Sequence, residues 1–373
     1  MSNQPEQEFV PQCDLGAGVA PEREQLDAAI HDVLDSGWFV LGKQVDRFEE
    51  QFAEWASVSH CVSVANGTDA LELALRALGV GPGDGVVVPG NSVSASAAAV
   101  TRTGGQPVFC DVHPRNYGLC PDHLRGLLQR DSSIRAIMAV HLYGHPCDLD
   151  GVMKVSRAFN VPVIEDIAQA PGARWKDRMV GQFGVMAAYS FYPTKNLGAL
   201  GDGGALTTQD ASLAEEIRCL RQYGWHQRFV SDICGVNSRL DELQAAILNV
   251  RLPRLDKNNE ARRRIASRYV EGLQGLPLTL PSTPTHAHHV YHQFVVQAEQ
   301  RDELAAALFD RGVGTAVQYP VPLHEQPAYS PFAIEALPVC EELAGRVLSL
   351  PMYPNLPAKH VDRVIDALHD ILT

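Results

Sequence analysis

Three separated segments of this chain carry polar side chains that together could perform one kind of chemistry. Lys195 lies in glycine-rich sequence just after an apolar run, and Asp166 ends another apolar run 29 residues earlier. Gly67 and Thr68 lie where a third run gives way to a helical pattern. A lysine can form an imine, a carboxylate can keep a pyridinium nitrogen protonated, and a helix N-terminus can hold a phosphate. These are the parts that pyridoxal phosphate needs to act as an electron sink.

Each segment also has a simpler interpretation. Asn66 or Thr68 could only cap a helix. Asp166 could cap a helix formed by the residues after it, and Gln169 would then lie one turn later, within reach of the phenolic oxygen of a pyridoxal ring. Lys195 could be an ordinary solvated lysine. If it is instead desolvated beside the glycines, its pKa falls and it becomes a nucleophile near neutral pH.

Short runs rich in Val, Ile and Ala must position these side chains. The runs are Val62–Val64, Val86–Val88, Val108–Asp111, Ala136–Val140, Val161–Glu165, Ala187–Phe191 and Ala205–Thr208. Helical patterns lie between most of them; Thr68–Leu78 has the apolar spacing of one buried helical face. This alternation predicts an α/β fold with a mostly parallel central sheet covered on both sides by helices. Asp166 would then lie at the carboxyl end of a strand, where such sheets bind ligands.

The sequence changes character after Leu252-Pro253, which predicts a large domain over 1–252, with an N-terminal arm, and a small α+β domain over 253–373. The elements expected in the small domain are a charged helix Lys257–Gly272, a connector Gly275–His288, a strand Val290–Val296, a helix Asp302–Arg311, a strand Val313–Gln318 and a final helix Lys359–Leu372. The catalytic parts named above all fall in the large domain.

Size and charge narrow the possible functions. The chain has 373 residues, 45% of them hydrophobic, so it can bury a large core. Its net charge of -13 does not favour binding to nucleic acid or to an anionic membrane. No run of about 18 apolar residues is present, and Met1–Val10 is too polar to be a signal peptide. We therefore expect a cytoplasmic protein.

Neither the cysteines nor the histidines predict a metal site. The eight cysteines are scattered and contain no C-x-x-C pair, so we expect reduced thiols. His286, His288, His289 and His292 lie near or within a connector that supplies no accompanying cysteines or carboxylates.

Six ordered motifs resemble the DegT/DnrJ/EryC1/StrS family of sugar aminotransferases. They are Asn66-Gly67-Thr68-x-Ala70-Leu71, Pro89-Gly90-Asn91-Ser92, Glu165-Asp166-x-Ala168-Gln169, Ser190-Phe191-x-x-x-Lys195, Gly203-Gly204-Ala205 and Gly235-x-Asn237-x-Arg239-x-Asp241-Glu242-Leu243-Gln244-Ala245-Ala246. The resemblance runs from about Trp38 to the carboxyl-terminal helix. It implies a fold-type I enzyme dependent on pyridoxal phosphate, like aspartate aminotransferase in architecture, and a homodimer with shared active sites.

The resemblance also assigns roles. Lys195 would be the Schiff-base lysine and proton shuttle, Asp166 would pair with the pyridine nitrogen, and Gln169 would contact the ring hydroxyl. Gly67, Thr68 and Ser190 would hold the phosphate, together with Asn237 from the neighbouring subunit. Family members often stack an aromatic residue on the ring at the position where this chain has Val93, so we expect a smaller stacking contribution here.

The segments around Lys195, Asn237 and Tyr319 are similar to the subgroup that aminates C3 of nucleotide-linked 3-keto-6-deoxyhexoses, with L-glutamate as the usual donor. Arg239, Tyr319 and His324 are then candidate contacts to sugar, diphosphate or donor, although packing would explain each of them equally well. A 4-aminotransferase of the perosamine or bacillosamine type, or an aminocyclitol aminotransferase, would use the same lysine and aspartate. A catalytically silent regulatory homologue is disfavoured because both residues are present, and a sugar dehydratase because Lys195 is not histidine.

Overall fold

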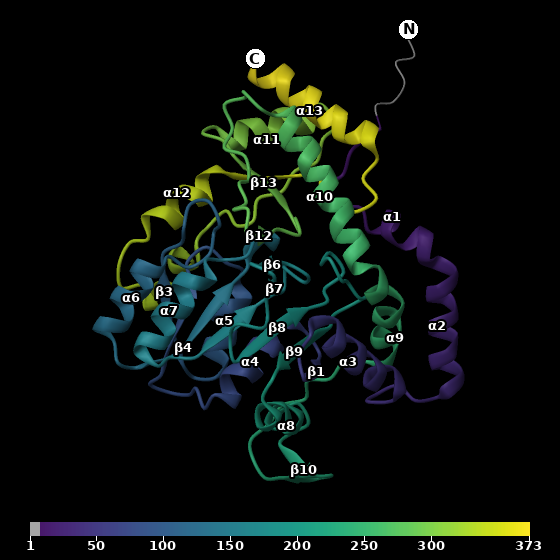
Figure 1. Ribbon diagram of the computed structural model, residues 1–373, viewed down its shortest axis with the longest axis vertical. Helices are drawn as coiled ribbons and strands as arrows, with labels where there is room; N and C mark the ends of the chain where they lie inside the picture. Colours follow the sequence, from purple (N-terminus) through teal and green to yellow (C-terminus); the bar gives the residue numbers. More distant parts are fainter. Residues whose placement is uncertain (1–7) are drawn as a thin grey trace.

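The central element is a seven-stranded sheet in a computed structural model that describes residues 8–373 (Figure 1). Its strand order is β1-β9-β8-β5-β4-β2-β3. The strands are β1 (His60–Val64), β2 (Gly85–Pro89), β3 (Gln106–Cys110), β4 (Ile134–Val140), β5 (Val163–Asp166), β8 (Met186–Ser190) and β9 (Gly204–Thr208). Only β9 runs antiparallel to its neighbours, so the prediction of a mostly parallel sheet is confirmed.

Alternate residues of the strands pack into two different cores. In β4, for example, Ile137 and Ala139 join one core, whereas Ala136 and Met138 join the other. Because side chains alternate along a strand, this places a hydrophobic core on each face of the sheet. The first face is covered by α3 (Lys43–Ala56), α6 (Pro121–Arg130), α7 (Leu149–Phe159) and α9 (Glu242–Arg251), and the second by α4 (Gly67–Ala77), α5 (Ser94–Arg102), α8 (Ala211–Leu220) and α12 (Pro338–Arg346).

The carboxyl-terminal part packs around a third core above the sheet in Figure 1. Its elements are α10 (Leu255–Gly272), α11 (Arg301–Asp310), α13 (Ala358–Leu372) and the antiparallel pair β13 (Phe294–Gln297) and β14 (Val347–Leu350). The α10 helix reaches from this part down to α9 (Figure 1), to which it is joined by the short 3-10 helix η3 (Leu252–Arg254). The division at 252/253 stays a prediction, because α12 also packs on the sheet.

Two expected strands of the carboxyl-terminal part differ from the structure. The strand predicted over Val290–Val296 begins only at Phe294, because Tyr291 has a φ of 45° and turns the chain. No strand forms over Val313–Gln318, where the structure has single bridges from Val313 to Val10 and from Ala316 to Ser349. The partner of β13 is instead β14, a strand that was not predicted from the sequence.

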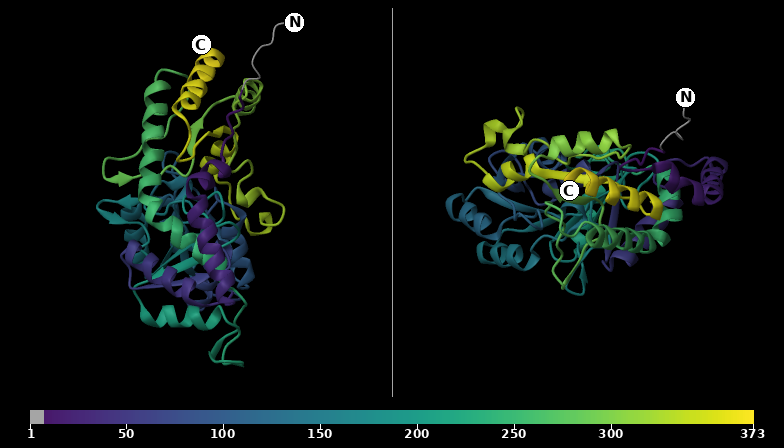
Figure 2. Two further views of the ribbon diagram at one scale, coloured as in Figure 1. Left: turned by 90° about the vertical axis from the view of Figure 1, so that its right-hand side faces the viewer. Right: turned by 90° about the horizontal axis from the view of Figure 1, so that it is seen from above.

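The N-terminal segment spans both parts of the molecule. Residues 8–14 run beside the carboxyl-terminal core, and α1 (Leu15–Val19), η1 (Ala20–Glu22) and α2 (Arg23–Ser36) then descend along the side of the molecule (Figure 2). The start of the predicted N-terminal arm, including most of Met1–Val10, lies outside the described residues. None of the helices between residues 8 and 373 has the length and apolar character needed to cross a membrane.

Smaller elements complete the structure. They are the sheet of β6 (Arg174–Trp175), β7 (Arg178–Met179) and β12 (Ala287–His288), the hairpin of β10 (Trp225–Gln227) and β11 (Val230–Ser231), and the 3-10 helices η2 (Leu142–Gly144), η4 (Leu323–Glu325) and η5 (Ser330–Phe332). The predicted connector Gly275–His288 thus contributes β12 to a sheet with β6. The hairpin projects from the bottom of the molecule in Figure 1.

Candidate active site

Lys195 and Asp166 lie beyond the carboxyl ends of two adjacent parallel strands. Strand β5 ends at Asp166, whose neighbour in β8 is Ala188. Strand β8 ends at Ser190, and a turn follows in which Lys195 N donates to Tyr192 O at 2.8 Å. The sheet therefore brings the amine and the carboxylate to one edge, as the sequence predicted.

Burial shifts both groups toward their neutral forms. Asp166 is 4% exposed, and its Oδ1 accepts one hydrogen bond, from Ala168 N at 2.9 Å. Burial raises the pKa of Asp166, while that hydrogen bond and the Lys195 charge partly oppose the shift. Burial lowers the pKa of Lys195 to about 8, with Asp166 acting in the opposite direction. A partly neutral amine near neutral pH is what a nucleophile or proton carrier requires.

The N-terminus of α4 and Ser190 form an anion cradle beside these groups. Asn66 caps the helix by accepting from Asp69 N at 2.9 Å, so the capping interpretation is correct for Asn66. The N–H groups of Gly67 and Thr68 nevertheless have no acceptor within residues 8–373. A Cβ on Gly67 would lie 2.6 Å from Ser190 Cβ, so only glycine allows the helix this close to β8. A phosphate fits here in charge and in donors.

Gln169 reaches the site from a turn. No helix follows Asp166, so the prediction that Gln169 lies one helical turn later is wrong; the carboxylate instead accepts the N–H two residues on, as in an Asx turn. Gln169 Oε1 accepts from Tyr143 N at 2.6 Å, and its Nε2 donates to Tyr319 Oη at 3.1 Å. Burial, and then Asp166, raise the pKa of Tyr319 to about 12, so the phenol is neutral at the site.

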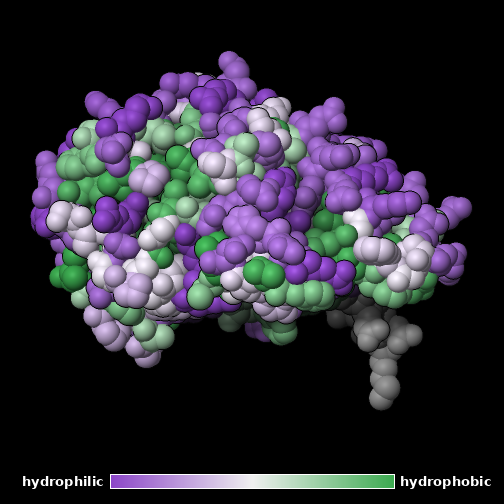
Figure 3. Space-filling view, turned by 90° about the horizontal axis from the view of Figure 1, so that it is seen from below, coloured by the Kyte–Doolittle hydropathy of each residue, from purple (hydrophilic) through white to green (hydrophobic). Residues whose placement is uncertain are grey.

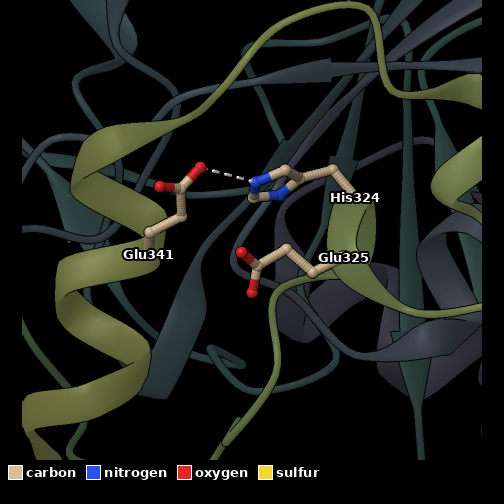
Figure 4. A group of neighbouring side chains, drawn as sticks. All are labelled: His324, Glu325 and Glu341. Atoms are coloured by element: carbon tan, nitrogen blue, oxygen red, sulfur yellow. Dashed lines mark hydrogen bonds and ion pairs between the residues drawn. The ribbon is translucent and has the colours of Figure 1, made fainter.

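His324 makes its contacts elsewhere. It is buried in η4, and its Nε2 lies 3.1 Å from Oε1 of Glu341 in α12, with the exposed Glu325 beside the pair (Figure 4). The ring of Phe109 in β3 also lies near His324, with 6.3 Å between the two ring centroids. His324 therefore packs between β3 and α12, and its role as a substrate contact stays a prediction.

Asn237 and Arg239 lie on a strand-like segment that is tied to α4. Between them, Ser238 Oγ donates to Asp69 at 2.7 Å and accepts from Ala65 N at 3.0 Å. Because side chains alternate along extended chain, Asn237 and Arg239 point away from this anchor. Asn237 is exposed and Arg239 partly buried. Val93, the residue in the aromatic position of the family, is the partly buried N-cap residue of α5.

A buried polar network beside Lys195 was not predicted from the sequence. Asn196 Nδ2 donates to Asn259 Oδ1 at 2.8 Å, and Asn196 Oδ1 lies 3.0 Å from His292 Nδ1. Burial, then Lys195 and Arg262, hold the pKa of His292 well below its usual range. In the sequence, Asn196 only follows Lys195, and His292 was considered only as part of a metal site. Tyr143 was also missed, although it follows the end of β4 as Asp166 ends β5.

Known proteins match this chain over almost its whole length. The sequence model of the DegT/DnrJ/EryC1/StrS aminotransferase family matches residues 21–369. The chain belongs to this family. A dTDP-3-amino-3,4,6-trideoxy-alpha-D-glucose transaminase from Streptomyces venezuelae is 45% identical over 373 residues, which cover 99% of this chain and 98% of the relative. Membership confirms the α/β aminotransferase fold and the enzyme class predicted from the motifs.

Solved structures of the family agree with the fold and with the cofactor. The crystal structure of S. venezuelae DesV in complex with a ketimine intermediate has a TM-score of 0.95 and 45% identity, and the match covers 98% of this chain and 99% of that one. The Bacillus subtilis NtdA structure with bound cofactor PMP has a TM-score of 0.92 and 30% identity, covering 100% of this chain and 87% of that one. Pyridoxal phosphate is the cofactor of this family member, and the amine, the acid and the phosphate cradle described above fit it.

Proposed function

We propose that this aminotransferase moves an amino group from L-glutamate to C3 of a nucleotide-linked 3-keto-6-deoxyhexose, most simply a dTDP sugar, in a ping-pong reaction. The observation that carries the proposal is the pair of Lys195 and Asp166 at the ends of β8 and β5, beside the open N-terminus of α4. The choice of a C3-keto sugar nucleotide draws on the 45% identical Streptomyces venezuelae relative, whose name describes a 3-amino sugar.

Bound pyridoxal phosphate supplies an electron-poor pyridinium ring that stabilises negative charge on a substrate carbon. Asp166 would hold the ring nitrogen protonated, because a buried carboxylate that accepts only one hydrogen bond can accept another from that N–H group. Lys195 Nζ holds the proton taken from the donor's α carbon and returns it in the next step, which requires an amine that is partly neutral at the working pH. The α4 N-terminus and Ser190 would hold the phosphate of the cofactor.

The first test follows each half-reaction separately. Adding L-glutamate to the holoenzyme should bleach the visible absorbance of the cofactor and release one 2-oxoglutarate per site, and adding the keto sugar should restore the absorbance. A panel of dTDP- and UDP-linked 3-keto and 4-keto hexoses then identifies the carbon by NMR of the product. Formation of a 4-amino sugar alone would overturn the choice of C3 and leave the reaction class intact.

Lys195→Ala should abolish turnover, by at least about 10⁴-fold, while leaving the protein folded. Borohydride should link the cofactor to the peptide that contains Lys195 in the unaltered protein, and this link should be absent in the variant. An exposed cation, Arg264, provides the control, because Arg264→Gln also removes a charge but at a side chain that does not line the cleft beside Lys195. Retention of turnover by Lys195→Ala would contradict the assignment.

The proposal includes a homodimer in which Asn237 acts on the partner's cofactor phosphate, as the resemblance implies. In its support, Asn237 is exposed, and the chain around the β10–β11 hairpin presents apolar side chains such as Phe229, which is 72% exposed. The face seen in Figure 3, which carries this hairpin, has hydrophobic areas among the hydrophilic ones. We also place the dimer in the cytoplasm; the free state of all eight cysteines agrees with a reducing compartment.

Hybrid dimers test the shared site. Lys195→Ala and Asn237→Ala are each expected to be inactive or weak alone. If Asn237 serves the partner, a hybrid of the two variants has one site with both residues intact and should regain about half of the unaltered activity per dimer. If Asn237 serves its own subunit, no site in the hybrid is intact and activity stays low. Light scattering of the same samples checks that they are dimers.

A further inference from the structure

A cleft of about 460 Å³ lies beside Lys195, between the N-terminal helices and the carboxyl-terminal part. The side chains on its walls come from the N-terminal segment, from the Lys195 turn, from α9 through α10, and from residues 353–355. None of these residues except Lys195 has a role in the reaction proposed for this site. The cleft is thus a separate space that opens onto the catalytic lysine.

The charges on the walls of the cleft do not balance. Glu22 pairs with Arg251 at 3.1 Å and lies 3.8 Å from Arg254, so one carboxylate already serves two guanidinium groups. Lys257 and Arg262 form no ion pair with any carboxylate in the part of the chain that the structure describes. The remaining wall carboxylate, Asp14, caps α1 by accepting from Ala17 N. The cleft therefore has unpaired positive charge.

Arg262 is a buried residue of this cleft whose guanidinium has hydrogen-bond donors without acceptors. It is 4% exposed, and its Nη1 donates to the carbonyl oxygens of Tyr291, His292 and Met352 at 3.1–3.3 Å. Its Nε is buried and has no acceptor among residues 8–373, and Nη2 makes no hydrogen bond there either. The three carbonyls hold the guanidinium plane fixed, and they leave its Nε–Nη2 edge free. That edge has two parallel N–H groups, which match the two oxygens of a carboxylate.

We propose that the Nε–Nη2 edge of Arg262 binds a carboxylate of the amino-acid donor in the cleft beside Lys195. A planar carboxylate suits this site better than a phosphate, because the edge is almost fully buried and offers two coplanar donors. Of the two substrates in the proposed function, on which this inference rests, only the amino donor carries carboxylates. Lys257, on the preceding turns of the same helix, adds a second cation for the other carboxylate of a dicarboxylic donor.

The neighbourhood of Arg262 agrees with this assignment. Lys195 and Arg262 both lie close enough to His292 for their charges to lower its pKa, so the guanidinium and the catalytic amine share this neighbour. Burial lowers the pKa of Arg262 to about 10, which leaves it fully charged at neutral pH. A buried charge without a counter-ion is unfavourable, and a bound carboxylate removes that cost. The carboxylates of the donor would then be held by two cations of α10.

The experiment compares the two half-reactions in Arg262→Gln, with Arg264→Gln as the control on the same helix. The dissociation constant for L-glutamate, from the rate of cofactor bleaching, should rise about 10- to 100-fold in Arg262→Gln and stay unchanged in the control. The second half-reaction, with pyridoxamine-loaded enzyme and keto sugar, should keep its rate. Calorimetric binding of glutarate, a dicarboxylate without an amine, should weaken by the same factor.

An unchanged glutamate constant in Arg262→Gln, or equal losses in both half-reactions, would overturn the inference. Arg262→Lys keeps the charge and a donor for the carbonyls but lacks the paired edge, so it should show a smaller loss in the same direction. If neither variant folds, the Nε–H signal of Arg262 in ¹⁵N-arginine-labelled unaltered holoenzyme decides: it should shift on adding glutarate, and no shift would refute the site. If the proposed function itself is wrong, L-glutamate will not bleach the cofactor absorbance even in the unaltered enzyme. This outcome is distinct from a failure of the Arg262 assignment.

Discussion

Two neighbouring carboxylates at the end of β5 face opposite sides of the sheet and have opposite surroundings. Glu165 is fully buried and accepts from His141 Nε2 at 3.1 Å and from the N–H groups of Gly181, Phe183 and Gly184 at 2.7–2.8 Å. Asp166 has a single donor, Ala168 N. The two residues are almost equally acidic as free side chains, so their surroundings separate them.

The pKa shifts of the two acids differ in sign for this reason. Burial acting alone would raise the pKa of Glu165, but His141 and the backbone N–H groups outweigh it, and the pKa lies below its usual range. Burial raises the pKa of Asp166, because its one hydrogen bond and the charges of Lys195 and His141 do not compensate. A carboxylate whose lone pairs are all used stabilises the fold. A buried carboxylate with free lone pairs is available for a cation, and in the proposed function that cation is the protonated ring of the cofactor.

The largest effect is expected from Asp166→Asn. The amide cannot stabilise the positive ring nitrogen, so kcat/KM should fall about 100- to 1,000-fold. The stability of the cofactor-free protein should not fall, because the substitution removes a buried and poorly solvated acid. Steady-state kinetics and chemical denaturation of the same preparation measure both. A large loss of stability with little loss of activity would reverse the roles that we assign to the two acids.

Glu165→Gln should show the opposite behaviour. Its new NH₂ group would face the donors His141 Nε2 and Gly181 N, so the free energy of unfolding should fall by about 3 kcal/mol. The protein that remains folded should keep a kcat/KM within a few-fold of the unaltered enzyme. Urea titration of the cofactor-free variant, followed by circular dichroism, gives the first number. A 100-fold loss of activity at full stability would show that Glu165 acts in the reaction.

The sequence predicted the position of Asp166 better than the surroundings of Glu165. Asp166 was identified because it ends an apolar run and precedes a recognisable motif, and the seven strands of the sheet were found because continuous runs of Val, Ile and Ala are typical of buried parallel strands. The partners of Glu165 could not be found, since Gly181, Phe183 and Gly184 donate through backbone N–H groups that any residue could supply. Gln169 was placed correctly near the site but on the wrong element, because the sequence Ile-Ala-Gln-Ala is compatible with a helix.

In the carboxyl-terminal part, too, the sequence predicted the elements with a clear local pattern and missed those that depend on distant contacts. The helices α10, α11 and α13 have spacings that identify them, whereas β14 is a short run, Val347–Leu350, whose pairing with β13 depends on contacts distant in sequence. The Val313–Gln318 segment has a strand-like composition, yet its neighbours allow it only single bridges. Arg262 was visible only as one of three successive arginines in a charged helix, and its burial follows from the tertiary packing of residues 291, 292 and 352 around it.

The last and most gradual effect concerns two buried histidines. Burial, then His145, hold the pKa of His289 well below its usual range, and burial does the same to His292. Both are neutral in the folded protein and bind protons only after unfolding, so stability should fall as the pH drops below about 6.5, by up to about 1.4 kcal/mol per pH unit for each histidine. The pKa of Glu165 is lowered, so its contribution is lost only below about pH 4.5, at a lower pH than that of the histidines.

Unfolding free energies of the cofactor-free protein between pH 7.5 and 5 measure this slope, and His289→Gln should reduce it. Asp166 changes stability in the other direction: its pKa is raised in the folded protein, so stability falls as the pH rises from about 3.8 through that value. Asp166→Asn should therefore remove only this opposing contribution and leave that of the two histidines unchanged. A changed histidine contribution in Asp166→Asn would mean that the charge of the carboxylate, which favours a protonated imidazole, acts on these histidines together with burial.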